Sequence, residues 1–370
     1  MGATPFPPTA HRPPRCRGRI MRLSRQENTM DIHHPPALSI LGAAPIEAWL
    51  QANPGRLLEL VAQVYLDAAE GLAGNPDSYF LRFADSDRNR IIALPAVLDD
   101  ARPVAGLKWI ASFPENTRHG LDRASALIIL NDRQTGYPLA CLEGSLISAA
   151  RTAASAVLGA RCLHPTPGHS AHFGVVGCGP IAWRTLCLLH QSGWALEQVS
   201  LCDLDPARAE RLRQRCQDLG LRARVAPLET CIRNSDLLLF ATSAVRPGID
   251  QAHWFAHAPT VLHLSLRDLA TNVVLQAQNL ADNVSHCLKA ATSLELAWLQ
   301  AGHQRFIAGD ISEALRGKVT PDPTRPRIFS PFGMGVLDLA VARAIHHDCA
   351  AQPHLRVTDF FPRPYQADQA

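Results

Sequence analysis

A glycine-rich turn is the first pattern in this sequence that could do chemistry. Residues 177–182 read Gly-Cys-Gly-Pro-Ile-Ala and follow the apolar run 173–176. Gly177 permits a tight turn, Gly179 leaves the backbone open to a pyrophosphate, and Ala182 allows a helix to pack closely on a strand. Pro180 suits the first turn of that helix, whose amino end attracts anions. The pattern predicts a dinucleotide-binding βαβ unit; a glycine turn in another kind of α/β domain is the alternative.

An acid closes the second strand of this unit. Asp203 follows the apolar residues 199–202 and stands 26 positions after Gly177, slightly beyond the usual spacing of about 20. A carboxylate there can accept hydrogen bonds from the ribose hydroxyls and would repel a 2′-phosphate. We therefore expect NAD rather than NADP as the cofactor.

Three cationic residues lie in apolar or small-residue stretches, where a charged side chain needs a partner or a function. Lys108 lies mid-strand between Leu107 and Trp109, where an ammonium is costly without a partner or a task; an open sheet face is the alternative. Arg82 lies in a similar apolar run and could clamp a carboxylate, or be a solvated edge charge. Arg151 opens a run of small residues and could reach an acidic ligand, or be an ordinary surface charge.

Asp268 is the candidate general base. It follows residues 264–267 at the end of a predicted strand, the edge at which open α/β sheets bind ligands. The alternative is that its side chain caps the next helix. Ala241, Thr242 and Ser243 end the preceding strand and either border a nicotinamide or cap a turn.

Composition excludes several classes of protein. The chain has 370 residues, 47% hydrophobic and 19% charged, which is ordinary for a globular protein of two domains. Residues 1–29 hold six arginines and one acid, leaving 30 basic against 32 acidic residues elsewhere, so no nucleic-acid-binding face is expected. Ten cysteines without a CxxC pair, and no long apolar segment, favour reduced thiols in the cytoplasm and no membrane contact.

The two ends of the chain carry features of a different kind. Residues 1–29 are rich in proline and arginine, and we expect a disordered extension, with Met30 as the true start. The pairs His33-His34 and His346-His347 have no ligand spacing with a cysteine or carboxylate cluster, so no metal site is assigned.

Apolar periodicity predicts the elements around the nucleotide unit. Helices are expected over 45–70 with a break at Asn53-Pro54, followed by antiparallel strands at 79–83, 90–95, 104–110 and 125–130, a strand at 139–143 and a helix at 148–160. Later we expect a helix at 206–219 capped by Asp205, strands at 237–242, 260–264 and near 283–286, a proline-rich linker at 318–327 and a helix at 335–347. The fold class is α/β, with a nucleotide-binding domain at 150–327 and a discontinuous α+β domain at 30–149 and 328–370 that binds substrate.

Taken together and in this order, Lys108, Arg151, the Gly177 turn and Asp268 resemble the ornithine cyclodeaminase/μ-crystallin family over residues 38–361. Segments 106–114, 123–126, 129–132, 141–143, 148–154, 262–268 and 330–335 are similar to its siderophore-pathway branch, which acts on N-(2-amino-2-carboxyethyl)-L-glutamate. Cyclodeaminases carry an Asp followed by a Pro-Gly turn at the catalytic acid, whereas this chain has Arg267-Asp268-Leu269. That difference favours the dehydrogenase branch.

The resemblance implies a Rossmann-type NAD domain, a homodimer formed through the first domain, and roles for individual residues. Arg82, Lys108 and Arg151 would hold substrate carboxylates, Lys108 would assist water attack, and Asp268 would be the acid/base. Cofactor contacts are expected from Gly177, Gly179, Pro180, Ile181, Asp203, Ala241, Thr242, Ser243 and Leu266. The product of the branch is 2,3-diaminopropionate with 2-oxoglutarate. A cyclodeaminase, an imine or amino-acid dehydrogenase, and a non-enzymatic NAD(P)H-binding protein of the μ-crystallin kind are the alternatives.

Overall fold

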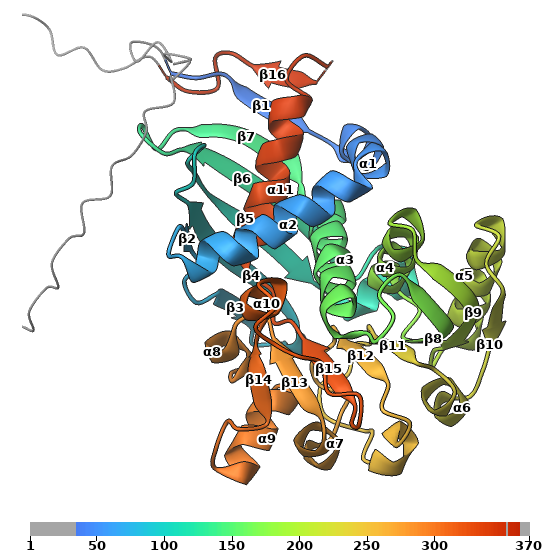
Figure 1. Cartoon of the computed structure of the whole chain (residues 1–370). Coiled ribbons are helices and arrows are strands. Elements are labelled where there is room, and N and C mark those ends of the chain that lie inside the picture. Colours follow the sequence, from blue (N-terminus) through green and yellow to red (C-terminus); the bar gives the residue numbers. More distant parts are fainter. Residues whose placement is uncertain (1–34, 353, 363–370) are drawn as a thin grey trace, which may run out of the picture. The chain divides into compact units, whose positions relative to one another are not determined.

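Two β-sheets organise the residues that the computed structural model describes, 35–352 and 354–362 (Figure 1). The predicted extension at 1–29, Met30 and the His33-His34 pair lie outside the described residues. Residues Pro36–Pro362 form one compact unit. The α/β fold class is confirmed.

The first sheet has eight strands in the order β16-β1-β7-β6-β5-β4-β2, with β3 paired to β4. Its strands are β1 Leu38–Leu41, β2 Ala73–Gly74, β3 Tyr79–Phe83, β4 Ser86–Leu98, β5 Val104–Ser112, β6 Ala124–Asp132, β7 Pro138–Glu143 and β16 Leu355–Val357. Strands β3 to β7 are antiparallel neighbours, so the predicted antiparallel sheet is confirmed. Strand β1 joins β7 in parallel.

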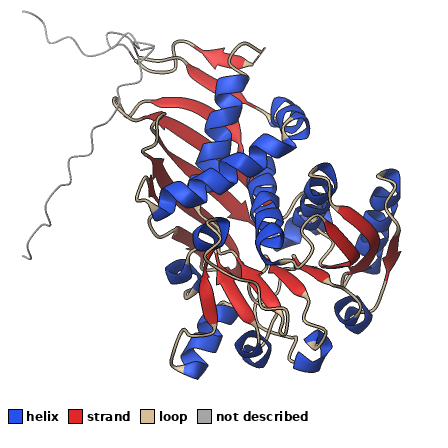
Figure 2. Cartoon of the chain, viewed as in Figure 1, coloured by secondary structure: helices blue, strands red, loops and turns tan. Residues whose placement is uncertain are grey.

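Helices cover one face of this sheet (Figure 2). They are α1 Ala43–Ala52, α2 Pro54–Ala69, α3 Gly144–Leu163 and α11 Gly335–Asp348, and the 3-10 helix η1 Pro114–His119 follows β5. Pro54 opens α2, which confirms the predicted break. Helix α11 packs on β4, β5 and β6, so the chain returns to the first sheet as expected. Among the described helices α3 alone is long and apolar enough to cross a membrane, and it is mostly buried, like a core helix.

The second sheet is parallel throughout, in the order β10-β9-β8-β11-β12-β15-β13-β14. Its strands are β8 His169–Val176, β9 Ala195–Cys202, β10 Ala223–Val225, β11 Leu237–Phe240, β12 Thr260–His263, β13 Gln278–Ala281, β14 Ile307–Asp310 and β15 Arg327–Ser330. The helices beside it are α4 Pro180–Gln191, α5 Pro206–Asp218, α6 Leu228–Arg233, η2 Ala252–Phe255, α7 Thr271–Gln276, α8 Val284–Cys287, α9 Ser293–Ala301 and α10 Ile311–Leu315. The direction of strand addition reverses between β8 and β11, and ligands bind at such a point in Rossmann-type sheets.

One expectation about this region is corrected, and the predicted domain boundaries can be compared with the observed elements. The strand expected near 283–286 is helix α8, because the side chain of Asn283 accepts a hydrogen bond from the His286 amide and starts a helical turn. Both predicted domain boundaries fall inside elements: 149/150 lies within α3, and 327/328 lies within β15, which pairs with β12 and β13. The assignment of the two sheets to separate domains stays a prediction.

Candidate active site

The glycine turn after β8 has the geometry that a dinucleotide needs. Gly177 has φ +90°, and a Cβ there would lie 2.6 Å from the carbonyl oxygen of Ala241. A side chain at this position would therefore strain the backbone and collide with Ala241. A Cβ at Gly179 would meet nothing within 4 Å. Gly179 is also the N-cap of α4, and Pro180 fills its first turn. The amino end of α4 therefore opens on free space where a pyrophosphate can approach.

The carboxylate of Asp203 is fixed beside this turn. Its Oδ2 accepts from the amide of Cys178 at 2.7 Å, and its Oδ1 accepts from the amide of Asp205 at 2.9 Å. Each carboxylate oxygen has a second lone pair, so Asp203 can hold the loop and also accept from ribose hydroxyls. Asp205 in turn caps α5 through the Ala207 amide, which confirms the predicted cap. The chain's own residues thus fit an adenine dinucleotide.

A buried cluster of two cations and one carboxylate lies on the helix-covered face of the first sheet. Lys108 Nζ donates to Asp338 Oδ2 at 2.6 Å and to Ser148 Oγ at 3.1 Å. Arg151 Nε donates to the other oxygen, Asp338 Oδ1, at 3.2 Å. Lys108 is 2% exposed and the side chain of Arg151 is 11% exposed. The open-face interpretation of Lys108 and the surface-charge interpretation of Arg151 are therefore wrong.

The charges in this cluster do not cancel. Burial lowers the pKa of Lys108 to about 8, although the Asp338 carboxylate works against the shift. Burial alone would raise the pKa of Asp338, but Arg151 and Lys108 outweigh it and hold that pKa below its ordinary value. With all three groups charged, a net positive charge remains, and one N–H of Lys108 is still free to donate. An anionic ligand is the partner that such a site suits.

A loop from the second sheet completes this cluster. Gly333 has φ +90°, and a Cβ there would lie 2.8 Å from Arg151 Nη1. Buried Asp282 holds the loop by accepting from the amides of Phe332 and Gly333 at 2.8 and 2.7 Å. Because β15 ends at Ser330, this loop leaves the carboxyl edge of the parallel sheet, the same edge as the glycine turn. The loop that carries Gly333 therefore connects the cationic cluster to the sheet edge at which the glycine turn lies.

Asp268 lies at the same edge, after β12, and accepts several hydrogen bonds. Thr242 Oγ1 and Ser265 Oγ donate to its two oxygens, and His263 Nε2 lies 3.2 Å from Oδ2. Burial opposes ionisation, but these neighbours outweigh it and hold the pKa of Asp268 below its ordinary value. The carboxylate is therefore ionised and able to accept a proton.

The capping alternative for Asp268 is wrong, because α7 begins at Thr271 with Ala270 as its N-cap. Two other predicted cofactor residues lie beside it. Ala241 packs against Gly177, and Leu266 is buried with φ +66°, a backbone conformation that only a few per cent of non-glycine residues adopt. The structure therefore brings the predicted residues from three strand ends, those of β8, β11 and β12, to one edge.

Arg82 does not join the Lys108 cluster. It lies exposed on β3, where its guanidinium stacks over the ring of Phe80 at 5.4 Å. In the sheet Arg82 pairs with Arg90, four positions from Leu94, the partner of Lys108. Four positions along a strand are about 13 Å. The predicted convergence of Arg82 with Lys108 and Arg151 is therefore not observed.

Sequence reasoning missed two residues of this site. Asp338 is fully buried in α11 and binds both cations, and His263 contacts Asp268 from the end of β12. A signal for Asp338 was present, because it is the one acid in the otherwise apolar run 335–342. A buried carboxylate needs a cationic or hydrogen-bonding partner.

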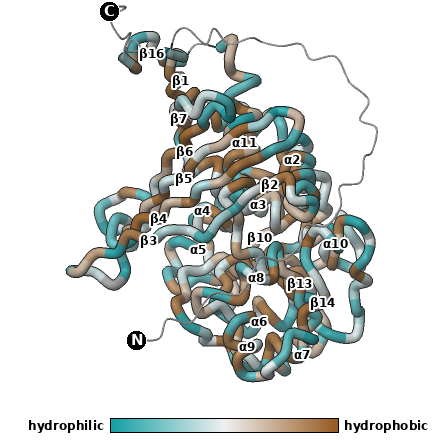
Figure 3. The backbone as a smooth tube through the Cα atoms, turned by 90° about the vertical axis from the view of Figure 1, so that its left-hand side faces the viewer, coloured by the Kyte–Doolittle hydropathy of each residue, from teal (hydrophilic) through white to brown (hydrophobic). Residues whose placement is uncertain are grey.

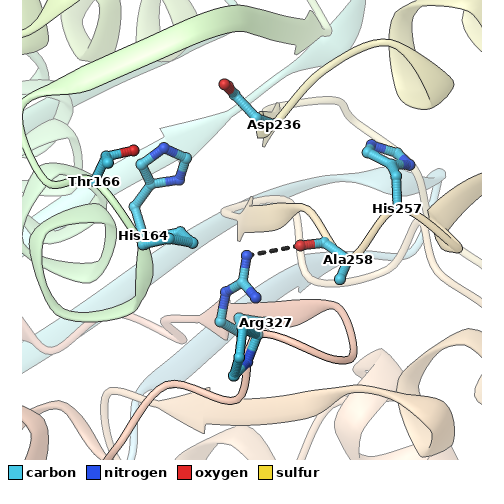
Figure 4. A pocket seen from close by; sticks show the side chains of 8 residues that line it. His164, Thr166, Asp236, His257, Ala258 and Arg327 are labelled. Atoms are coloured by element: carbon cyan, nitrogen blue, oxygen red, sulfur yellow. Dashed lines mark hydrogen bonds between the residues drawn. The ribbon is translucent and has the colours of Figure 1, made fainter.

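A hollow lies at the opposite, amino edge of the parallel sheet (Figure 4). Its polar lining is already satisfied: Arg327 donates to the carbonyl oxygen of Ala258 at 2.6 Å, and His257 Nε2 lies 2.8 Å from the carbonyl oxygen of Ser235. In the described part of the chain, no group of three His, Cys, Asp or Glu side chains could hold a metal ion. We therefore place the candidate active site at the carboxyl edge.

Several known proteins are similar to this chain. The N-((2S)-2-amino-2-carboxyethyl)-L-glutamate dehydrogenase of Staphylococcus aureus is 25% identical over 310 residues, covering 79% of this chain and 91% of that protein. The alanine dehydrogenase of Archaeoglobus fulgidus is 26% identical over 305 residues, covering 80% and 90%. A solved archaeal alanine dehydrogenase dimer with bound NAD has the same fold, with a TM-score of 0.78 at 24% identity, covering 88% of this chain and 100% of that one. The model of the ornithine cyclodeaminase/mu-crystallin family matches residues 55–352, and the chain belongs to that family.

Proposed function

We propose that the protein is an NAD-dependent oxidoreductase acting on a CH–NH bond, and that its substrate is N-(2-amino-2-carboxyethyl)-L-glutamate. The products are 2-oxoglutarate and 2,3-diaminopropionate. The observation that carries the proposal is the buried Lys108–Asp338–Arg151 cluster, which keeps a net positive charge beside the edge that holds Asp268. The staphylococcal relative bears the name of this activity.

The residues of the chain have separate roles in the proposed reaction. The glycine turn and Asp203 would hold NAD⁺, which would supply the oxidation by accepting a hydride from the glutamate Cα, so that the C–N bond becomes a protonated C=N bond. Lys108 and Arg151 hold the carboxylate next to that carbon and so fix its orientation. Asp268 accepts a proton from the water that attacks the resulting C=N bond. Asp268 then returns this proton to the nitrogen, and the C–N bond breaks so that the nitrogen leaves as an amine. The hydroxyl on the carbon loses its proton to Asp268 and becomes the ketone of 2-oxoglutarate.

Mass spectrometry of products, with NADH absorbance followed in parallel, tests this proposal. Protein, NAD⁺ and the conjugate should give one equivalent each of 2-oxoglutarate, 2,3-diaminopropionate and NADH. A cyclodeaminase regenerates its cofactor in each turnover, so proline formation from ornithine without NADH accumulation would contradict the proposal. Nucleotide binding without turnover of any glutamate conjugate would favour a binding protein instead.

The choice of cofactor depends on Asp203. We expect Asp203→Ala to weaken NADH binding, because the ribose loses its acceptor. In Asp203→Ser with Leu204→Arg, the phosphate meets a cation in place of a carboxylate, so NADPH should begin to bind; Leu204 is fully exposed and free to change. Fluorescence titration with both nucleotides measures the shift, and Leu204→Arg alone is the matched control. Equal affinity of the unmutated protein for NADH and NADPH would contradict the role given to Asp203.

Lys108 should make carboxylate binding dependent on pH. Its pKa of about 8 lies below the ordinary value of 10.5, so the ammonium is present below about pH 8 and is lost above it. We expect the inhibition constant of 2-oxoglutarate to rise as pH increases through this region, because the neutral amine no longer attracts the anion. Lys108→Arg keeps its charge and should give a flat profile between about pH 6.5 and 9.5. A flat profile for the unmutated protein would show that the charge of Lys108 does not contribute.

We also propose that the protein is a cytoplasmic homodimer. The nine described cysteines are all free, which supports a reducing compartment. In Figure 3 the strands β4 to β7 lie to the left, and the helices α2 and α11 lie to their right. Tyr79, Trp109 and Leu127 lie in one row across the strands on the face that no described helix covers, with exposures of 73%, 40% and 48%. An uncovered apolar sheet face is suited to pairing with its copy.

The dimer is tested by placing charges on this face. Trp109→Glu with Leu127→Glu should give a monomer, because each charge would be buried without a partner in the interface. Light scattering after size exclusion measures the mass. Leu299→Glu, on the exposed side of α9 at 65% exposure, is the matched control and should leave the mass unchanged. A monomeric unmutated protein would overturn the dimer proposal.

A further inference from the structure

A second group of arginines lies on the same face of the first sheet as Lys108, one row of paired residues further along. Arg90 on β4 pairs with Ser112 at the end of β5, and Ser112 pairs with Ala124 on β6. Arg123, just before β6, donates from Nη1 to Ser112 Oγ at 3.1 Å. This row is four strand positions, or about 13 Å, from the row of Lys108.

An apolar floor separates the two cationic rows. Ile92, Ile110 and Ala126 pair across β4, β5 and β6 on the helix-covered face, midway between them. Ile92 and Ile110 are half-buried, whereas core positions of the same sheet such as Ile128 are fully buried. The side chains of lysine and arginine are long enough to lean over such a floor from both sides. A flexible dicarboxylate can therefore reach both rows with its methylenes on the isoleucines.

Arg267 brings the group to the catalytic carboxylate. It directly precedes Asp268, and its Nε and Nη2 donate to the carbonyl oxygen of Ala290 at 3.1 and 2.6 Å. Burial lowers the pKa of Arg90, Arg123 and Arg267, and the positive charge of Arg90 adds to the lowering at the other two. Arg82, the partner of Arg90 on β3, adds to the lowering at Arg90, whereas Glu295 and Asp268 oppose the lowering at Arg267. Among the described side chains, no acid forms an ion pair with Arg90, Arg123 or Arg267.

We propose that Arg90, Arg123 and Arg267 form a second carboxylate subsite, which binds the side-chain carboxylate of the glutamate half of the substrate. The inference rests on the proposed function for the identity of that half. The other end of the conjugate carries an ammonium beside its carboxylate, which three guanidinium groups would repel. The glutamate side chain ends in a carboxylate with no cation near it, and bidentate hydrogen bonds from arginine suit it.

Binding of two product-like acids tests the subsite without any turnover. The protein with NADH is titrated with 2-oxoglutarate and with 2-oxopentanoate, which has a methyl group in place of the second carboxylate. We expect the unmutated protein to prefer 2-oxoglutarate by about 10- to 100-fold, the range of a charge-assisted hydrogen bond. In Arg90→Gln with Arg123→Gln the preference should disappear while the affinity for 2-oxopentanoate is unchanged. Arg88→Gln removes an exposed charge from the same strand and should keep the preference.

The outcomes separate the subsite from the reaction. No preference in the unmutated protein, or the same preference in the double variant, would overturn the subsite. If the double variant does not fold, Arg267→Gln is measured in its place; this loop residue should lose at least part of the preference, and a full preference would overturn the proposal. NADH formation from the conjugate is read in a separate assay. If the protein prefers 2-oxoglutarate but does not oxidise the conjugate, the subsite is supported and the proposed reaction is contradicted.

Discussion

Asp268→Asn should lower kcat by about 10²- to 10⁴-fold while substrate affinity changes little, because the amide keeps the shape of the carboxylate but cannot accept a proton. Thr242 and Ser265 donate to different oxygens of Asp268, so in the variant one hydroxyl still donates to the amide oxygen and the other can turn to accept from the amide NH2. The loss therefore falls on proton removal from water. Initial rates of NADH formation across substrate concentrations measure kcat and KM separately.

The matched control for this variant is Asp205→Asn. Asp205 caps α5 at the same edge of the sheet, and asparagine caps helices equally well, so its kcat should be unchanged. If Asp268→Asn stays within a factor of about three of the unmutated kcat, which is less than a modest general-base contribution, Asp268 is not the base.

Asp338→Asn should cost about 3–5 kcal/mol of stability, because it removes one partner of a buried ion pair and leaves the other charge uncompensated. Both oxygens of Asp338 are used, one by Lys108 and one by Arg151, and the side chain is fully buried. Removal of the negative charge of Asp338 should also release Arg151 from its position beside Gly333. Denaturant unfolding measures the stability, and 2-oxoglutarate titration measures the second effect.

Two further variants serve as controls for Asp338→Asn. Lys108→Met with Asp338→Asn removes a cation together with the carboxylate and should recover part of the lost stability. Asp99→Asn breaks an exposed pair with Arg133, whose side chains are 48% and 49% exposed, and should cost at most about 1 kcal/mol. Equal destabilisation by Asp99→Asn and Asp338→Asn would show that the buried cluster does not stabilise the fold.

The parts of this site that the sequence predicted are those in which a local pattern has one physical explanation. The Gly177 turn requires a positive φ and a close backbone, and both follow from residue types in succession. Lys108 was suspected because an ammonium among apolar neighbours needs a partner. The partner itself was not predictable, since Asp338 lies 230 positions away and reaches Lys108 only through the packing of α11 on β5.

The positions of Arg82 and of the short elements were not predictable for a different reason. The position of Arg82 depends on how β3 pairs with β4, and that register contains an irregularity after Arg82 that no sequence period reveals. Residues 283–286 are too few for a period to separate a strand from one helical turn. The predicted boundary at 327/328 falls inside β15, because that strand pairs with β12 and β13, which are distant in sequence.

The place of β15 in its sheet affects which strand edges are exposed while the chain is being synthesised. This strand, Arg327–Ser330, is inserted between β12 and β13, which were synthesised before it. A growing chain that has not reached residue 330 therefore leaves the edges of both strands open, and exposed apolar edges of this kind invite pairing with other chains. At about 5–20 residues per second, the interval from Ala281 to Ser330 lasts seconds. We expect a chaperone that acts during biosynthesis to protect those two edges.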